Sequence, residues 1–149
     1  MDVVVKIIHQ EQLYVAKGAT EIHTILGSCV AVCLYDERFK IAGMNHYLLP
    51  LWNGEGLKTL KYGNISIERL IEEMLKNGAI KKNIVAKIFG GASINLEQTF
   101  SVGIKNVTIA KTVLNDHKIP IVAEDTGGNK GRKVILNSLD GSVYVKYSS

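Results

Sequence analysis

The sequence predicts a layered α/β domain, an α+β sandwich with mixed, largely antiparallel sheets and two main helices. Three observations lead to this class. About seven short segments have the composition of strands, and two longer segments have the 3.6-residue periodicity of amphipathic helices. In addition, 46% of the 149 residues are hydrophobic, which is enough to build a substantial core. The length is that of one domain, so we expect residues 1–149 to form a single unit.

The N-terminal third is expected to consist of strands. Residues 3–8 (VVVKII) and 12–17 (QLYVAK) predict two strands around a short polar turn. Residues 29–36 (CVAVCLYD) and 41–50 (IAGMNHYLLP) predict two more, separated by the polar ERFK stretch. The Gly, Asn and Pro residues of segment 49–64 then predict a long loop.

Helices and strands follow one another in the rest of the chain. A first amphipathic helix is predicted by apolar residues three and four positions apart: Ile67, Leu70, Ile71, Met74 and Leu75. Asn64 or Ser66 is suited to cap its start, and Asn77-Gly78 is suited to end it. Residues 104–117 predict a second amphipathic helix.

Three further segments favour strands. Residues 84–91 (IVAKIFGG) predict a buried strand that ends in a glycine turn, and residues 119–125 predict another strand. Residues 133–139 and 142–147 predict a hairpin around Asp140-Gly141. The stretch TGGNKGRK between these strands lacks the phosphate-binding P-loop pattern, so we expect a turn there.

Charge and hydropathy exclude two classes of partner. The net charge is +4, but no aromatic residues are interleaved with the lysine clusters as a nucleic-acid surface requires. A solvated basic face, or a preference for an acidic protein, explains the charge. No apolar run approaches the roughly 18 residues that span a bilayer, and the N-terminus lacks the features of a signal peptide. We therefore expect a cytoplasmic protein that is not inserted in a membrane.

The two cysteines, Cys29 and Cys33, lie four residues apart. They could form a disulfide, provide half of a metal site, fill the core, or act as a nucleophile with a bystander. In one strand their Cα atoms would be roughly 13 Å apart, too far for a disulfide. A metal site needs about four ligands, and the four histidines are scattered. The sequence thus predicts neither a metal nor another cofactor.

The predicted hairpin of residues 29–36 and 41–50 brings a histidine near the first cysteine. If Tyr35 pairs with Lys40, then Cys29 lies directly opposite His46. If instead the loop spans residues 37–40, Cys29 lies diagonal to His46. Both registers place the two side chains on one face of the sheet, because side chains alternate along a strand.

A cysteine beside a histidine has a recognised chemistry. The imidazole can take the proton of the thiol, and the thiolate is a nucleophile. The Gly-Ser turn before Cys29 can also direct backbone N–H groups toward an oxyanion. Cys33, between Val32 and Leu34, is expected to be buried and inert. The competing interpretation is that Cys29 also fills the core.

Several motifs in the same order along the chain resemble the chemoreceptor glutamine deamidase (CheD) family of bacterial chemotaxis. They are LGSCVAVCLYD, AGMNHYLLP, KIFGGA, GIKNV, IPIVAEDTGGNKGRKV and GSVYVK. The resemblance implies a sandwich related to the deamidating domain of cytotoxic necrotizing factor toxins. It implies hydrolysis of glutamine side chains of methyl-accepting chemotaxis receptors to glutamate, and in some members hydrolysis of glutamyl methyl esters. The hydrolysis that the resemblance implies requires no cofactor.

The resemblance also assigns the site residues. The family cysteine corresponds to Cys29 and the family histidine to His46. The third family residue is a threonine that orients the histidine, five or six positions before the cysteine. Thr24 stands at five and His23 at six. We assign the role to Thr24, with His23 as the alternative if six is the structural position.

The resemblance leaves a second class of function open. Family members also act as adaptors that bind a CheC-type phosphatase of the response regulator, and such a protein could keep the fold without the chemistry. A redox sensor that uses Cys29 and Cys33 is a third class, disfavoured by their separation.

Trp52, in the loop after His46, either lines a substrate entrance or closes the core.

Overall fold

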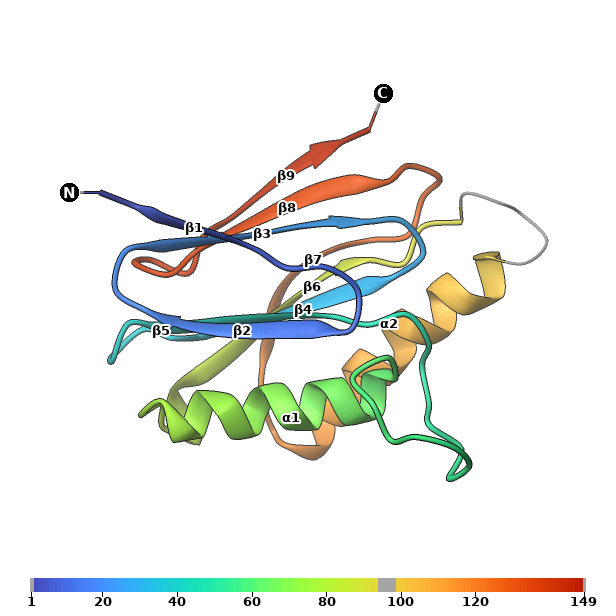
Figure 1. Ribbon diagram of the computed structural model, residues 1–149, viewed down its shortest axis with the longest axis horizontal. Coiled ribbons are helices and arrows are strands. Elements are labelled where there is room, and N and C mark those ends of the chain that lie inside the picture. Colours follow the sequence, from blue (N-terminus) through green and yellow to red (C-terminus); the bar gives the residue numbers. More distant parts are fainter. Residues whose placement is uncertain (1, 94–98, 149) are drawn as a thin grey trace.

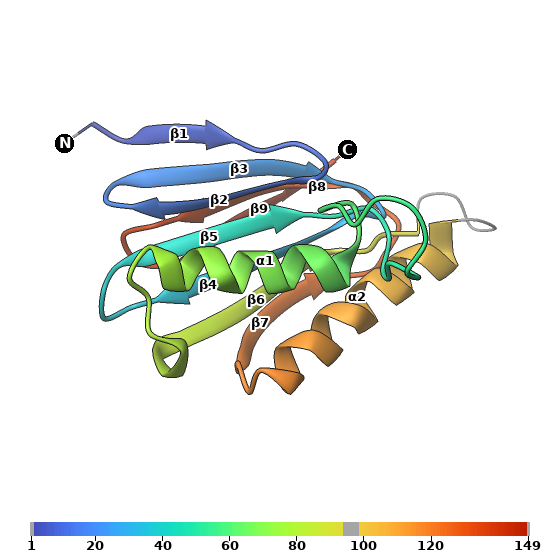
Figure 2. The same ribbon diagram turned by 60° about the horizontal axis from the view of Figure 1, so that its bottom comes forward.

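The molecule consists of three layers, two β-sheets and a pair of helices. In the computed structural model, which describes residues 2–93 and 99–148, a four-stranded sheet packs on one face of a five-stranded sheet. Helices α1 (Gly63–Lys76) and α2 (Thr99–Asp116) cover the other face of the five-stranded sheet (Figures 1 and 2). This arrangement confirms the predicted layered fold class with mixed sheets and two main helices.

The other elements within residues 2–93 and 99–148 are nine strands and a short 3-10 helix. Their bounds are β1 (Val4–Ile7), β2 (Gln12–Lys17), β3 (Thr20–Leu26), β4 (Val30–Asp36), β5 (Ile41–His46), η1 (Lys81–Asn83), β6 (Ile84–Gly90), β7 (Ile121–Thr126), β8 (Arg132–Asn137) and β9 (Val143–Tyr147).

The strand order explains why the sheets are mixed. The smaller sheet has the order β1-β3-β8-β9 and the larger β2-β5-β4-β6-β7. The β1–β3 and β6–β7 pairs are parallel, and all other pairs are antiparallel. The parallel β6–β7 pair is connected through α2, as a parallel crossover requires.

Strand β3 was absent from the strands predicted above. Its sequence, TEIHTIL, alternates between buried and more exposed side chains along its length. The strands predicted over residues 3–8 and 12–17 belong to different sheets, because β1 pairs with β3 and β2 pairs with β5. Strand β3 therefore crosses back to the first sheet and carries Thr24 with it.

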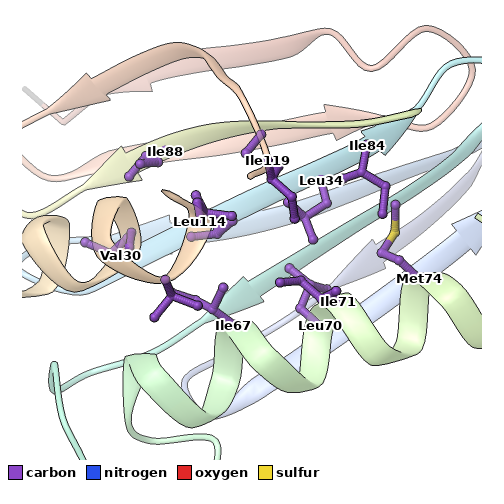
Figure 3. Close-up of a cluster of buried hydrophobic side chains, with 14 of the residues drawn as sticks. Val30, Leu34, Ile67, Leu70, Ile71, Met74, Ile84, Ile88, Leu114 and Ile119 are labelled. Atoms are coloured by element: carbon purple, nitrogen blue, oxygen red, sulfur yellow. The ribbon is translucent and has the colours of Figure 1, made fainter. Parts of the chain in front are cut away.

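The larger core lies between the five-stranded sheet and the helices. Figure 3 shows α1 side chains such as Leu70 and Met74 directed at β4 and β6, beside Leu114 of α2. The smaller core fills the space between the two sheets, where Ile22 of β3 and Leu136 of β8 join buried side chains of β4 and β5. Strand β4 is buried over its whole length because it contributes to both cores.

The ends of the helices differ in part from the prediction. Helix α1 begins at Gly63 after the N-cap Tyr62, and no side chain caps it. Asn64 instead accepts a hydrogen bond from the backbone of Trp52, and Ser66 accepts one from Asn45. The predicted capping roles of Asn64 and Ser66 are therefore wrong, whereas the end at Asn77 is as predicted.

Two other predictions concern helices and the long loop. Helix α2 begins at Thr99, five residues before the predicted start. Trp52 is half-buried in the 49–64 loop, and its indole N–H donates to the Glu55 carbonyl 3.1 Å away, so it does not belong to the core. Across the described residues, no helix combines the length and apolar character needed to cross a membrane.

The packing of α1 leads to a stability prediction. Leu70 is fully buried against the sheet, whereas Leu75 of the same helix is 42% exposed. We expect Leu70→Ala to lower the free energy of unfolding by about 3 kcal/mol because it leaves a cavity in the core. Leu75→Ala, the matched control, should cost less than about 1 kcal/mol. Urea unfolding at neutral pH measures both, and equal losses would contradict the described packing.

Candidate active site

The register of the β4–β5 hairpin places Cys29 near His46. Cys33 pairs with Met44, and Asp36 pairs with Ile41 across a loop of residues 37–40. This is the second of the two predicted registers, so the alternative with Tyr35 opposite Lys40 is wrong. Cys29 precedes the first residue of β4 and lies diagonal to His46 rather than directly opposite.

Cys29 and His46 belong to the same face of the five-stranded sheet. Cys29 packs against the cluster of buried side chains between the two sheets, to which Cys33 and Met44 belong. His46 is two residues beyond Met44 on β5, so alternation directs its side chain to that same space. His46 is 4% exposed, and Cys29 is partly exposed at the end of the core.

Thr24 reaches His46 from the opposing sheet. Its hydroxyl Oγ1 lies 2.7 Å from Nδ1 of His46 and 2.9 Å from the carbonyl oxygen of Ile8. A hydroxyl has one hydrogen, and the Ile8 carbonyl can only accept. The Thr24 hydroxyl therefore donates to Ile8 and accepts from the Nδ1–H of His46.

This hydrogen bond determines the tautomer of His46. With the proton on Nδ1, atom Nε2 of the neutral ring carries a lone pair. Nε2 is buried and has no hydrogen-bond partner among the described residues. The imidazole is thus held with its basic nitrogen free, on the face of the sheet that carries the Cys29 thiol.

The structure distinguishes between Thr24 and His23. Thr24 is 2% exposed and points into the space between the sheets. His23, the next residue towards the N-terminus, points to the other face of β3, where its Nε2 lies 3.0 Å from Oε1 of Glu21. Thr24, and not His23, contacts His46.

Burial keeps both members of the pair neutral at neutral pH. Desolvation lowers the pKa of His46 to about 4, with a smaller effect from the nearby His9. Desolvation also raises the pKa of the Cys29 thiol, and the backbone N–H of Cys29 opposes that rise by pointing at the sulfur. The resting site therefore holds a thiol and a neutral base, and proton transfer must accompany nucleophilic attack.

The second cysteine has a different environment. Cys33 is 2% exposed, and burial raises the pKa of its thiol to about 12. Both cysteines are free thiols. Cys33 is buried as expected, and its reactivity is suppressed by both access and pKa.

Two backbone hydrogen bonds and one side-chain amide hold the turn that carries Cys29. The Gly91 N–H donates to the Cys29 carbonyl at 2.9 Å, and the Ala92 N–H donates to the Gly27 carbonyl at 3.0 Å. A Cβ atom on Gly90, whose φ is +106°, would lie 2.2 Å from the Cys29 carbonyl oxygen. Only glycine fits there, which explains the FGGA stretch that ends β6.

Asn106 of α2 makes the third attachment, and sequence reasoning did not identify it. Its Nδ2 donates to the carbonyl oxygens of Ser28, at 3.0 Å, and Leu48, at 2.9 Å. The sequence contained a signal: Asn106 is a polar residue within the apolar stripe that includes Gly103 and Ala110.

A cavity of about 400 Å³ borders the imidazole side of the site. Its lining includes His46 of the larger sheet and, from the smaller sheet, His23, Thr24, Ile25 and Lys133. Cys29 does not line this cavity, and its side chain is partly exposed to solvent. In the described part of the chain, no three His, Cys, Asp or Glu residues are grouped so that they could hold a metal ion.

Comparison with known proteins identifies the family. The family model described as CheD chemotactic sensory transduction matches residues 48–147. A probable chemoreceptor glutamine deamidase CheD of Sulfurimonas denitrificans is 53% identical over 145 residues, which cover 95% of this chain and 93% of that protein. The corresponding protein of Trichlorobacter lovleyi is 54% identical over 127 residues, 83% of this chain and 78% of that protein. This chain belongs to the CheD family.

A solved structure supports the fold of this CheD. A Neisseria meningitidis protein of the DUF152 family superposes with a TM-score of 0.50 at 10% sequence identity. The match covers 85% of this CheD and 63% of the Neisseria protein. At such low identity the likeness concerns the layered fold alone. The resemblance to the CheD family inferred from the sequence motifs is confirmed.

The low pKa of His46 makes the stability of this CheD depend on pH. Because the pKa is about 4 in the folded state and 6.5 in the unfolded state, the unfolded state binds more protons between these values. The free energy of unfolding therefore falls as pH falls from 6.5 to 4, by about 3 kcal/mol from this residue. We expect His46→Gln to remove that part of the acid destabilisation, measured by urea unfolding between pH 7 and pH 4.

His117→Gln serves as the control, because His117 lies beside Glu68, 2.7 Å away, outside the site. His117→Gln should show the same loss of stability from His46 between pH 6.5 and pH 4 as wild type does. Identical pH dependence in wild type and His46→Gln would contradict the buried, neutral state of His46.

The contact between Thr24 and His46 predicts a spectroscopic signature. In wild type at neutral pH, imidazole nitrogen shifts should show the Nδ1–H tautomer of His46. Thr24→Ser keeps the hydroxyl and should preserve that tautomer, whereas Thr24→Val should abolish the preference. His23→Ala should leave it unchanged. An Nε2–H tautomer in wild type, or a change caused by His23→Ala, would refute the assignment.

Proposed function

We propose that this CheD hydrolyses glutamine side chains of chemoreceptors to glutamate and releases ammonia. The observation that carries the proposal is the buried imidazole of His46, held by Thr24 with Nε2 free on the face that carries Cys29. Relatives up to 54% identical are named probable chemoreceptor glutamine deamidases, and this name supplies the substrate class.

In the first step, Sγ of Cys29 attacks the carboxamide carbon of the glutamine side chain. Nε2 of His46 accepts the thiol proton as the carbon–sulfur bond forms. The oxyanion that develops lies near the backbone N–H of Cys29, which already points at the sulfur. The low pKa of the imidazole ensures that its lone pair is available at neutral pH.

In the second step, the protonated His46 delivers its proton to the departing nitrogen. The carbon–nitrogen bond breaks, ammonia leaves and a thioester with Cys29 remains. His46 is neutral again and activates a water molecule, which attacks the thioester. The carbon–sulfur bond breaks, the thiol regains its proton and the product is a glutamate side chain.

Thr24 has an orienting role in this mechanism. Its hydroxyl fixes the Nδ1–H tautomer, and its own hydrogen is committed to the Ile8 carbonyl. This resembles the third residue of a catalytic triad, although a hydroxyl provides less stabilisation for an imidazolium than a carboxylate does. Glutamyl methyl esters fit the same sequence of steps, with methanol as the leaving group, so we include receptor methylesterase activity in the proposal.

An adaptor for a CheC-type phosphatase is the second candidate taken from the sequence. Binding alone does not require a buried histidine with a free ring nitrogen, which costs stability at acid pH. The site therefore favours a catalytic role, and the two roles are compatible in one protein. Because the substrate is the receptor's cytoplasmic domain, we expect this CheD to act in the cytoplasm.

The two cysteines provide a matched test of the proposal. Wild type incubated with a chemoreceptor cytoplasmic domain should increase the receptor mass by about one dalton for each converted glutamine. Cys29→Ala should lose this activity, because it removes the nucleophile. Cys33→Ala should retain it, because Cys33 is buried in the core. Intact-mass and peptide-mass spectrometry measure the conversion.

Two results would overturn the deamidase proposal: full activity of Cys29→Ala, or a receptor that wild type leaves unchanged. A pull-down with a CheC-type phosphatase completes the comparison. Binding that persists in Cys29→Ala would show that adaptor and enzyme functions are separable in this chain.

A further inference from the structure

Asn106 connects the two segments that carry the candidate catalytic residues. It lies fully buried on α2, behind the five-stranded sheet. Its Nδ2 donates to the Ser28 carbonyl, one residue before Cys29, and to the Leu48 carbonyl, two residues after His46. The same amide nitrogen therefore bonds to both segments.

A second contact strengthens the attachment on the histidine side. The hydroxyl of Tyr47, the residue directly after His46, donates to the backbone carbonyl of Asn106 at 2.5 Å. Tyr47 is itself fully buried. The end of β5 is thus attached to α2 through a side chain and through a backbone carbonyl.

The β-ladder does not provide this connection. The last backbone pair between the two segments joins Val30 and Tyr47, with N–O distances of 3.0 and 3.2 Å. Beyond it, the turn with Gly27 and Cys29 hydrogen-bonds to Gly91 and Ala92, after the end of β6. Asn106 bridges the two segments at the point where the β4–β5 ladder has ended.

The chemistry of the amide fits this position. A side-chain amide carries two N–H donors on one atom, and two carbonyl acceptors require both. The flipped orientation would direct Oδ1 at two carbonyl oxygens, so the acceptors determine the orientation. Oδ1 is buried without a partner among the described residues. A buried acceptor without a partner lowers the stability of the fold. Such a cost is typical of residues that serve function rather than stability.

We propose that Asn106 is a positioning residue that fixes the distance and orientation of Cys29 relative to His46. This inference rests on the proposed function, since positioning matters only if the pair reacts. Misplacement of reacting groups by a fraction of an ångström lowers the rate of the chemical step, whereas substrate binding depends on other surfaces. The effect is therefore expected in kcat and not in KM.

The test compares Asn106→Asp and Asn106→Leu with wild type on a chemoreceptor cytoplasmic domain. Asn106→Asp keeps the shape but, when ionised, offers no donor to Ser28 or Leu48. At pH 7.5 we expect kcat to fall by at least about tenfold in both variants, with KM within about threefold of wild type. Protonation gives the Asp side chain one O–H donor, so its deficit should shrink as pH falls to 5.5. The deficit of Asn106→Leu should not.

Ser138→Ala is the control for a general loss of stability. Ser138 is a fully buried polar residue that accepts a hydrogen bond from the Thr20 backbone at 2.9 Å, at the opposite end of β3 from Leu26. It should lose stability yet keep kcat. If the kcat of Asn106→Leu matches that of Ser138→Ala, the positioning role is overturned while the deamidase proposal stands.

A second readout does not depend on the receptor. Alkylation of Cys29 by iodoacetamide, followed by peptide mass, should differ between wild type and His46→Ala. The alkylation rate with His46 present, divided by the rate with His46→Ala, should approach one when both proteins also carry Asn106→Leu. When both carry Ser138→Ala instead, this ratio should stay as it is in its absence. If wild type fails to deamidate but this pattern holds, the proposed function fails and the positioning role remains. Equal alkylation rates for wild type and the single variant His46→Ala would overturn both the proposed function and the positioning role.

Discussion

The arrangement of the site depends on strand β4 being buried on both faces. Its even-numbered positions, such as Val32 and Leu34, face the helices, and its odd-numbered positions, such as Cys33, face the smaller sheet. A shift of one residue would exchange these two sets, which differ in size and shape, so neither core would remain well packed. The β4–β5 register is therefore strongly specified, and the face occupied by Cys29 follows from it. The smaller sheet must then cover that face, which brings β3 over His46.

The single hydrogen of the Thr24 hydroxyl connects this packing to chemistry. Because the Ile8 carbonyl takes that hydrogen, Thr24 can only accept from His46. Ile8 lies in the chain that passes from β1 to β2, between the sheets. The tautomer of a histidine on one sheet is thus set by a residue on the other and by the crossover between them. A change in how the sheets pack would alter the basicity of Nε2 without touching either reacting atom.

Much of the hairpin could be predicted from sequence, and the contacts across the sheets could not. Alternation and loop length limited Cys29 and His46 to one face, because both are local properties of a single hairpin. Strand β3 was not predicted, although its alternation is typical of a half-buried strand, because it forms no local hairpin: β1 pairs with it in parallel and β8 is distant in sequence. Without that strand, the choice between Thr24 and His23 rested on spacing alone. The role of Asn106 depends on the rotation of α2 against the sheet, which no local pattern determines.

Burial gives the site its chemistry and also its main requirement. A low dielectric disfavours both the thiolate and the imidazolium, so the resting pair is neutral and the charges form together during attack. Charge formed in this way is stabilised only by the partner charge and by donors already aimed at it, since water cannot reorganise inside the core. The separation of Cys29 and His46 must therefore be held closely. Both residues lie near strand ends, and the β4–β5 ladder stops at the Val30–Tyr47 pair beside them. Attachments from outside the sheet meet this requirement: Gly91 and Ala92 fix the cysteine turn, Thr24 fixes the imidazole, and Asn106 joins the two segments.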